Sequence, residues 1–172
     1  MNDYNRIVQL TIKYRGIIIH QMSHLEKALD TYIATYLTGG DQTKIGEMQL
    51  LIFGDNRITL ESKRQIFQYI AEHHDNHWYN SYKPVRTSIA SKKKSNPFNK
   101  DLVWVIEQRN IFAHCIPDTS NEAYLKQDSV GFIKFIDKAE VFHFTYENFM
   151  ELENTILALT RYFMHKNGVH DY

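Results

Sequence analysis

The sequence has little of what several specialised folds require. Its single cysteine, Cys115, excludes an internal disulfide framework and a zinc site with several cysteine ligands, and it agrees with a reducing compartment. Only 7 glycines and 3 prolines among 172 residues leave little room for a loop-rich or repetitive architecture. The longest apolar run covers only residues 102–106, and no apolar segment follows the N-terminus. We therefore expect neither a membrane-spanning helix nor a signal peptide, and predict a cytoplasmic protein without a membrane partner.

Net charge is also absent, because Lys+Arg and Asp+Glu are equal at 20 each. Global steering toward a polyanion is not expected. The segment 76–100, however, holds six basic residues and no acid, with Lys92, Lys93 and Lys94 at its centre and three aromatic residues upstream. Basic groups interleaved with aromatic rings suit contact with RNA. Two interpretations stay open: an RNA-binding loop at these three lysines, or a solvated lysine loop that aids solubility.

A chain of this size predicts one domain over residues 1–172. Apolar residues recur at steps of three and four from Ile7 to Tyr36, which predicts one long helix that two adjacent glycines end at 39 and 40. A second helix is expected from the N-cap Thr59 to about residue 74. A closing helix is expected from the N-cap Thr145 to about residue 166.

A third long helix is expected to end near Ile116, before Pro117. Two residues could be its N-cap: Asn96, which precedes Pro97, or Asn99, which has Asp101 two residues later. From about 130 to 144 the apolar period changes to two and the residues are aromatic or β-branched, which predicts a small β-hairpin. The fold class is therefore mostly all-α, with long helices and a hairpin inserted before the last one.

Three polar residues interrupt the apolar pattern of the third helix. Two apolar stripes run along it and both are expected to be buried, yet Arg109, Asn110 and His114 occupy positions that the pattern assigns to aliphatic side chains. Such residues persist when they are paired or when they line a cleft. In the first case Arg109 pairs with Glu107 or Glu153, and the other two make hydrogen bonds inside the core.

The spacing of these residues bears on the oligomeric state. Asn110 and His114 are four apart and share a helix face, whereas Arg109 and His114 lie roughly 140° apart around the axis. One helix cannot easily bring Arg109 and His114 to a single small atom. Two copies of the helix related by a two-fold axis would do so, which predicts a homodimer with a composite site.

The segment Arg109-Asn110-Ile111-Phe112-Ala113-His114 resembles the R-x4-6-H motif of the HEPN superfamily, in its common form Arg-Asn-x-x-Ala-His. The long opening helix, the helix over 58–70 and the C-terminal helix are similar to the superfamily's bundle, so the resemblance covers most of the chain. It implies an up-and-down bundle of four to five helices, to which the hairpin is an addition.

The resemblance implies a metal-independent endoribonuclease that acts as a dimer without a cofactor, often in toxin, antiviral or abortive-infection systems with an antitoxin or defence partner. RNA cleavage by its own 2′-hydroxyl needs proton transfer and charge stabilisation at the phosphorane. His114 suits proton transfer, Arg109 suits the phosphate and the transition-state charge, and Asn110 suits positioning. We take these three as the candidate catalytic residues.

Two alternatives stay open, and a third is disfavoured. The first is that some members of the superfamily keep the bundle but act as non-catalytic dimeric interaction or regulatory modules. In addition, superfamily toxins that are silenced by nucleotide addition carry tyrosine where this chain has Ile116, so that form of neutralisation is not expected. A helical nucleic-acid-binding protein that relies on the segment 76–100 alone is the second. The third is a metal pair at His73 and His77, which are four apart but lack an evident third ligand, so we predict no metal site.

Overall fold

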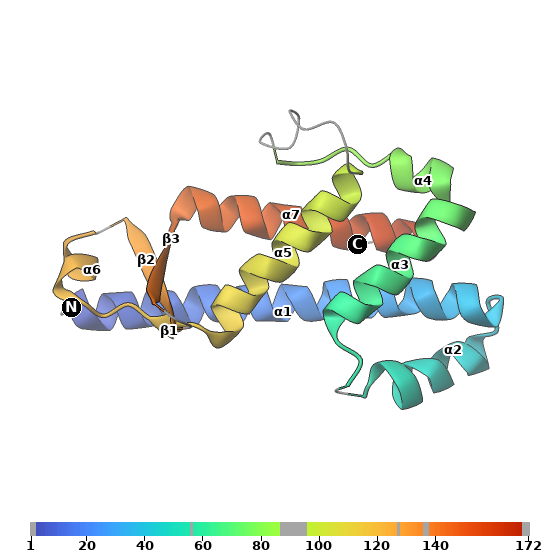
Figure 1. Ribbon diagram of the computed structural model, residues 1–172, viewed down its shortest axis with the longest axis horizontal. Helices are drawn as coiled ribbons and strands as arrows, with labels where there is room; N and C mark the ends of the chain where they lie inside the picture. The colour runs from blue at the N-terminus through green and yellow to red at the C-terminus, as the bar shows by residue number, and fades with distance from the viewer. Residues whose placement is uncertain (1–2, 56, 87–95, 127, 136–137, 170–172) are drawn as a thin grey trace.

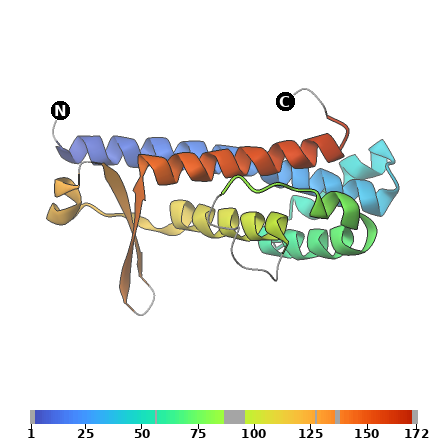
Figure 2. The same ribbon diagram turned by 90° about the horizontal axis from the view of Figure 1, so that it is seen from above.

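The computed structural model describes residues 3–55, 57–86, 96–126, 128–135 and 138–169, which form a mostly helical structure with one small antiparallel sheet. Two long helices, α1 (Asp3–Thr38) and α7 (Tyr146–Lys166), lie side by side and run in the same direction (Figures 1 and 2). A second layer holds α3 (Leu60–His74) and α5 (Pro97–His114). The helix α5 runs in the opposite direction to both long helices. Between α1 and α3 the chain returns through α2 (Gln42–Met48) and the π-helix η1 (Gln49–Phe53).

The predicted helix boundaries follow from local signals that the structure confirms. Gly39 and Gly40 end α1 with φ of 65° and 87°, a backbone region that favours glycine. Thr59 caps α3 by accepting a hydrogen bond from the Ser62 amide. Asn96, not Asn99, is the N-cap of α5, because its side chain accepts from the Phe98 amide and proline occupies the first turn. The helix α5 ends at His114, two residues earlier than expected.

The closing helix α7 begins with a capping box at Thr145 and Asn148, as the position of Thr145 predicted. It ends at Lys166, before Gly168 in a positive-φ conformation. Its buried face packs along α1, where the Tyr14 and Phe149 rings stack with centroids 4.0 Å apart. Apolar periodicity and end caps therefore account for the two longest helices.

The centre of the core is a cluster of aromatic rings contributed by α1, α3, α5, α7 and the short helix α4 (Asn76–Asn80). Phe67 contacts Phe98 and Phe163 with ring centroids 5.2 and 5.0 Å away, and all three side chains are fully buried. Trp78 stacks on Tyr32 at 5.4 Å. Such ring pairs add to the stabilisation from burial alone, so this cluster holds the two layers together.

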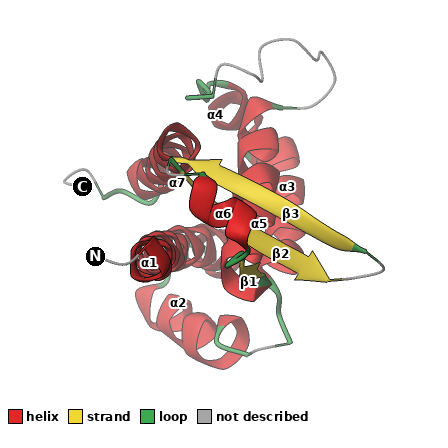
Figure 3. Cartoon of the chain, turned by 90° about the vertical axis from the view of Figure 1, so that its left-hand side faces the viewer, coloured by secondary structure: helices red, strands yellow, loops and turns green. Residues whose placement is uncertain are grey.

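The sheet lies at the end of the bundle from which α7 starts (Figure 3). The predicted hairpin is confirmed as β2 (Ser129–Phe135) and β3 (Ala139–Thr145), and β1 (Ile116–Pro117) adds a short strand that the sequence did not predict. The short helix α6 (Asn121–Leu125) connects β1 to β2. Strands β2 and β3 extend past the layer of α3 and α5 (Figure 2), so one face of the hairpin stands beside the C-terminal end of α5.

Candidate functional site

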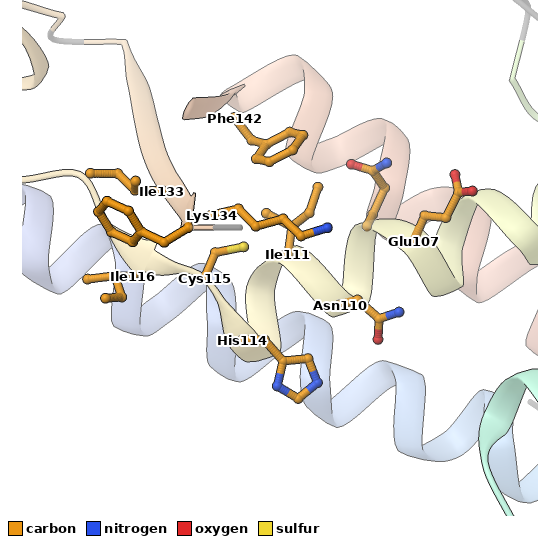
Figure 4. Close-up of a pocket in the computed structure, with 11 residues that line it drawn as sticks. Glu107, Asn110, Ile111, His114, Cys115, Ile116, Ile133, Lys134 and Phe142 are labelled. Carbon is orange, nitrogen blue, oxygen red and sulfur yellow. The ribbon is translucent and has the colours of Figure 1, made fainter. Parts of the chain in front are cut away.

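An open groove of about 860 Å³ lies between the C-terminal half of α5 and the three strands. Its volume is within the range of about 300–1,000 Å³ that is typical of ligand sites. Figure 4 shows the helix side of the groove with Asn110 and His114, and the strand side with Lys134 and Phe142. The lining side chains are Glu107, Gln108, Asn110, Ile111, His114, Cys115, Ile116, Ile133, Lys134, Phe135 and Phe142.

Asn110 and His114 are exposed and lie one turn apart in this groove. The expectation that both stripes of α5 are buried is therefore wrong at this end of the helix. Ile106 is buried on the second stripe, but the positions that follow it are half-buried or exposed, because the groove opens there. Hydrogen bonding inside a core is excluded for these two side chains, and within the described residues the His114 imidazole has no hydrogen-bond partner.

Arg109 is half-buried and lies outside the lining of the groove. Its Nη1 donates a hydrogen bond to the Asn110 Oδ1 at 3.2 Å. The sequence alternative of an ion pair with Glu107 or Glu153 is not seen among the described residues, and Glu153 accepts from Gln21 Nε2 at 2.7 Å instead. Within one chain the structure thus brings Asn110 and His114 together and links Arg109 to them only through Asn110.

Arg15 of α1 fixes the end of the helix that carries His114, and sequence reasoning missed it. Its Nη2 donates to the Cys115 carbonyl oxygen at 2.7 Å, and its guanidinium carbon lies 5.6 Å from the centre of the Phe132 ring. The last carbonyls of a helix lack internal partners and carry partial negative charge, so a cation is favourable there. Because the partners are 100 residues apart, no local pattern points to this contact.

Cys115 is buried at the base of the groove. Burial raises the pKa of its thiol, although the nearby charges of Lys134 and Arg15 lower it in part. A thiol with a raised pKa stays protonated at neutral pH and is a poor nucleophile. Cys115 therefore acts as a small apolar side chain, and the chemistry of the groove depends on its nitrogen-bearing groups.

The structure tests only the aromatic part of the prediction for the basic segment 76–100. Lys92, Lys93 and Lys94 lie outside the described residues, so their assignment to RNA binding stays a prediction. The interleaved aromatic residues before them do not face a ligand, because Tyr79 and Tyr82 are buried and Trp78 packs against the core. Their ring contacts with neighbouring helices are the reason.

The last described residue before these lysines is firmly held. Arg86 Nε lies 3.0 Å from Oδ1 of the fully buried Asp101. Its guanidinium also lies over the Trp104 ring at 3.9 Å. Burial raises the pKa of Asp101, although the Tyr82 hydroxyl and Arg86 lower it in part. The chain therefore enters the lysine segment from a fixed point beside the start of α5.

The histidine pair does not have the geometry of a metal site. His73 is in α3 and His77 is in α4, with a break at Asp75, so they do not share one helix face. The His73 Nδ1 lies 2.9 Å from the Tyr69 carbonyl oxygen. Across the part of the chain that the structure describes, no group of three or more His, Cys, Asp or Glu side chains is placed to hold a metal ion.

The fold and the groove together define a helical protein with an open site whose polar side chains include one imidazole, two amides, one carboxylate and one lysine ammonium. No family model, curated protein or solved structure matches this chain. Within the described ranges no helix combines the length and the apolar character needed to cross a bilayer.

Proposed function

We propose that this protein is a metal-independent endoribonuclease of the HEPN type that cleaves RNA through attack by the 2′-hydroxyl at a site shared by two subunits. The observation that carries the proposal is the position of the motif at the end of α5. His114 and Asn110 are exposed in one groove, and Arg109 is bonded to Asn110. These are the groups that the resemblance assigns to catalysis.

Each group has a role that its chemistry supports. Imidazole accepts or donates protons near neutral pH, so His114 takes the 2′-hydroxyl proton or returns one to the leaving 5′-oxygen. The Arg109 guanidinium stays charged and binds phosphate oxygens in a planar fork, which stabilises the charge that develops on the phosphorane. Asn110 holds the arginine through its side-chain oxygen and can orient the phosphate through its amide nitrogen.

The proposal includes a homodimer because one chain does not bring Arg109 and His114 into the same groove. Arg109 does not line the groove that contains His114, so a single subunit does not place both groups around one phosphate. Ile116 and Phe135, which line the groove, and Val141 expose large apolar side chains on the sheet face that holds Ile133. A second copy packed there would bury this apolar surface and bring Arg109 of the partner subunit toward His114.

The first test is cleavage of single-stranded RNA by the purified protein in EDTA. His114→Ala and Arg109→Ala are expected to abolish cleavage and to leave the free energy of unfolding within about 2 kcal/mol of wild type. His77→Ala and Arg161→Ala, which change exposed residues outside the groove, are the matched controls and should cleave normally. A wild-type protein that leaves a panel of RNAs intact would contradict the proposal.

The shared site has a sharper test. If each active site combines His114 of one subunit with Arg109 of the other, a dimer of one His114→Ala chain and one Arg109→Ala chain retains one intact site of two. After subunit exchange at equal concentrations, half the dimers are mixed, so about a quarter of the wild-type activity should return. Two inactive variants that stay inactive together would rule out the composite site.

The same measurements decide between this proposal and a non-catalytic dimeric regulatory module. A dimer in sedimentation that cleaves no RNA would favour the module. A toxin or phage-defence role, an antitoxin or defence partner, and backbone contacts from Lys92, Lys93 and Lys94 belong to the proposal as its biological setting and auxiliary RNA surface.

A further inference from the structure

We infer that the hairpin wall of the groove is a binding subsite for one nucleotide of single-stranded RNA, in which the Lys134 ammonium binds a phosphate and the Phe142 ring stacks on an unpaired base. This inference rests on the proposed function and names the substrate class of the same groove. It adds two residues, from β2 and β3, that the motif on α5 does not contain.

The register of the hairpin puts these two side chains on one face. Phe132 pairs with Phe142 and Lys134 pairs with Glu140, so alternation along the strands directs all four toward the same side of the sheet. Phe132 is fully buried on Phe112 of α5, with ring centroids 4.9 Å apart. Phe142 lies opposite Phe132 on the neighbouring strand and Lys134 lies two residues further along β2, and both line the groove.

In Figure 4 the Lys134 side chain extends across the groove between Phe142 and Asn110. The ammonium group is exposed, and the described part of the chain offers it no hydrogen bond or ion pair within 4 Å. Phe142 is half-buried, so its ring is anchored on the core while part of it borders the groove. The wall therefore presents one free cation and one anchored aromatic ring opposite His114.

This pair of groups matches an unpaired nucleotide. Proteins that bind single-stranded RNA combine cations that follow the phosphates with aromatic rings on which bases stack. A nucleobase inside a duplex is already stacked and paired, and it cannot reach the Phe142 ring in the groove without leaving the RNA double helix. Glu107 lines the groove and Glu140 stands opposite Lys134, so negative charge limits the favourable position for a phosphate to the strip between Lys134 and His114.

A second protein chain is the less favourable occupant of this wall. Packing a protein surface over it would remove water from a lysine and a histidine that have no partner within the described residues, and desolvating such groups is unfavourable. The exposed apolar side chains Ile116, Phe135 and Val141 belong to the other side of the hairpin, which suits the partner subunit. The subsite and the proposed dimer contact therefore use opposite faces of the hairpin, although Ile116 and Phe135 also line the groove.

The test measures binding rather than cleavage, in a His114→Ala background that keeps the RNA intact. The probe is a fluorescein-labelled, unstructured 12-nucleotide RNA, and anisotropy is recorded over a series of salt concentrations. Lys134→Ala should weaken binding about two- to fivefold and reduce the slope of log K against log salt by about 0.7, the value for one phosphate of a single strand. Lys138→Ala removes the same charge from the same hairpin outside the groove lining and should change neither quantity.

Phe142→Leu keeps an apolar side chain against the core but removes the ring. It should weaken binding of the single strand about fivefold, the low end of the loss measured for one stacked base. It should leave the weaker binding of a duplex of the same sequence unchanged. Tyr69→Leu, which removes an exposed aromatic ring of α3 outside the groove lining, is its control and should bind the single strand as the background protein does.

Several outcomes would overturn the inference. Equal affinity and salt dependence in Lys134→Ala and Lys138→Ala would remove the phosphate contact. Loss of the dimer in Phe142→Leu, measured by sedimentation, would assign the wall to the partner subunit, and a background protein that binds neither RNA would remove the subsite altogether. If the predicted losses of binding occur but wild-type protein never cleaves RNA, the proposed function fails and the subsite stands. If wild-type protein cleaves RNA and both Lys134→Ala and Phe142→Leu bind normally, the subsite fails and the proposed function stands.

Discussion

Replacing Lys63 with methionine is expected to destabilise the protein by about 3–5 kcal/mol, the loss typical of removing one partner from a buried ion pair. Lys63 is 2% exposed in α3. Its Nζ donates to Glu26 Oε1 at 2.7 Å, to Asp30 Oδ2 at 2.9 Å and to the Phe53 carbonyl oxygen at 3.1 Å. Methionine fills a similar volume but leaves the buried Asp30 carboxylate without its cation. Since domains are stable by only about 5–15 kcal/mol, the loss is a large fraction of the total.

The pH dependence separates this mechanism from simple loss of packing. Burial raises the pKa of Asp30 to about 6, although the hydrogen bond and charge of Lys63 lower it in part. An acid whose folded-state pKa exceeds its unfolded value stabilises the protein fully below the unfolded pKa, and this contribution is lost as pH rises through the folded pKa. Without Lys63 the pKa of Asp30 rises further, so the variant keeps losing stability above pH 6. We therefore expect a larger difference from wild type at pH 7.5 than at pH 5.

Urea unfolding at both pH values measures the effect. Lys27→Met is the matched control, because Lys27 is an exposed lysine on α1 that bonds Gln49 of η1, and it should lose less than about 1 kcal/mol. Adding Asp30→Asn to Lys63→Met should recover stability at pH 7.5 by removing the buried charge. The reasoning is refuted if Lys63→Met is no less stable than Lys27→Met, or if its deficit is the same at both pH values.

Three further substitutions have expected effects on the free energy of unfolding. Arg15→Met should lose about 1.5–3 kcal/mol, the contribution of a hydrogen bond from a charged donor, because it leaves the Cys115 carbonyl oxygen without its partner; a loss below 0.5 kcal/mol, roughly the scatter of surface variants, would contradict this. Gly131→Ala should lose about 1–3 kcal/mol, because its new Cβ would lie 2.8 Å from the Asp118 Cβ; unchanged thermal melting would show that the backbone adjusts without cost. Gly16→Ala should gain about 0.5–1 kcal/mol, since it lies inside α1 with open space around it, and a lower melting temperature would oppose that account.

The candidate site shows where sequence reasoning worked and where it did not. The five-residue spacing of Arg109 and His114 predicted that one helix would not bring them to one point, and the structure places Arg109 outside the groove. The burial expected for both apolar stripes was wrong at the end of α5, where Asn110 and His114 line a groove, because periodicity states which residues share a helix face but not whether another element covers that face. No local signal singles out Lys134, because a lysine in an alternating strand looks like an ordinary solvent-facing residue.

The sequence by itself determined the four long helices and the hairpin, since their signals are local. The apolar stripe of α1, the glycines after it and the capping box at Thr145 act over a few residues and need no distant partner. Tertiary structure alone decided what lies beside the motif. The contact of Arg15 with Cys115, the buried Lys63 cluster and the groove between α5 and the hairpin join residues far apart in the chain. Only folding sets these distances, because packing of whole elements determines which polar groups meet and which remain open to solvent.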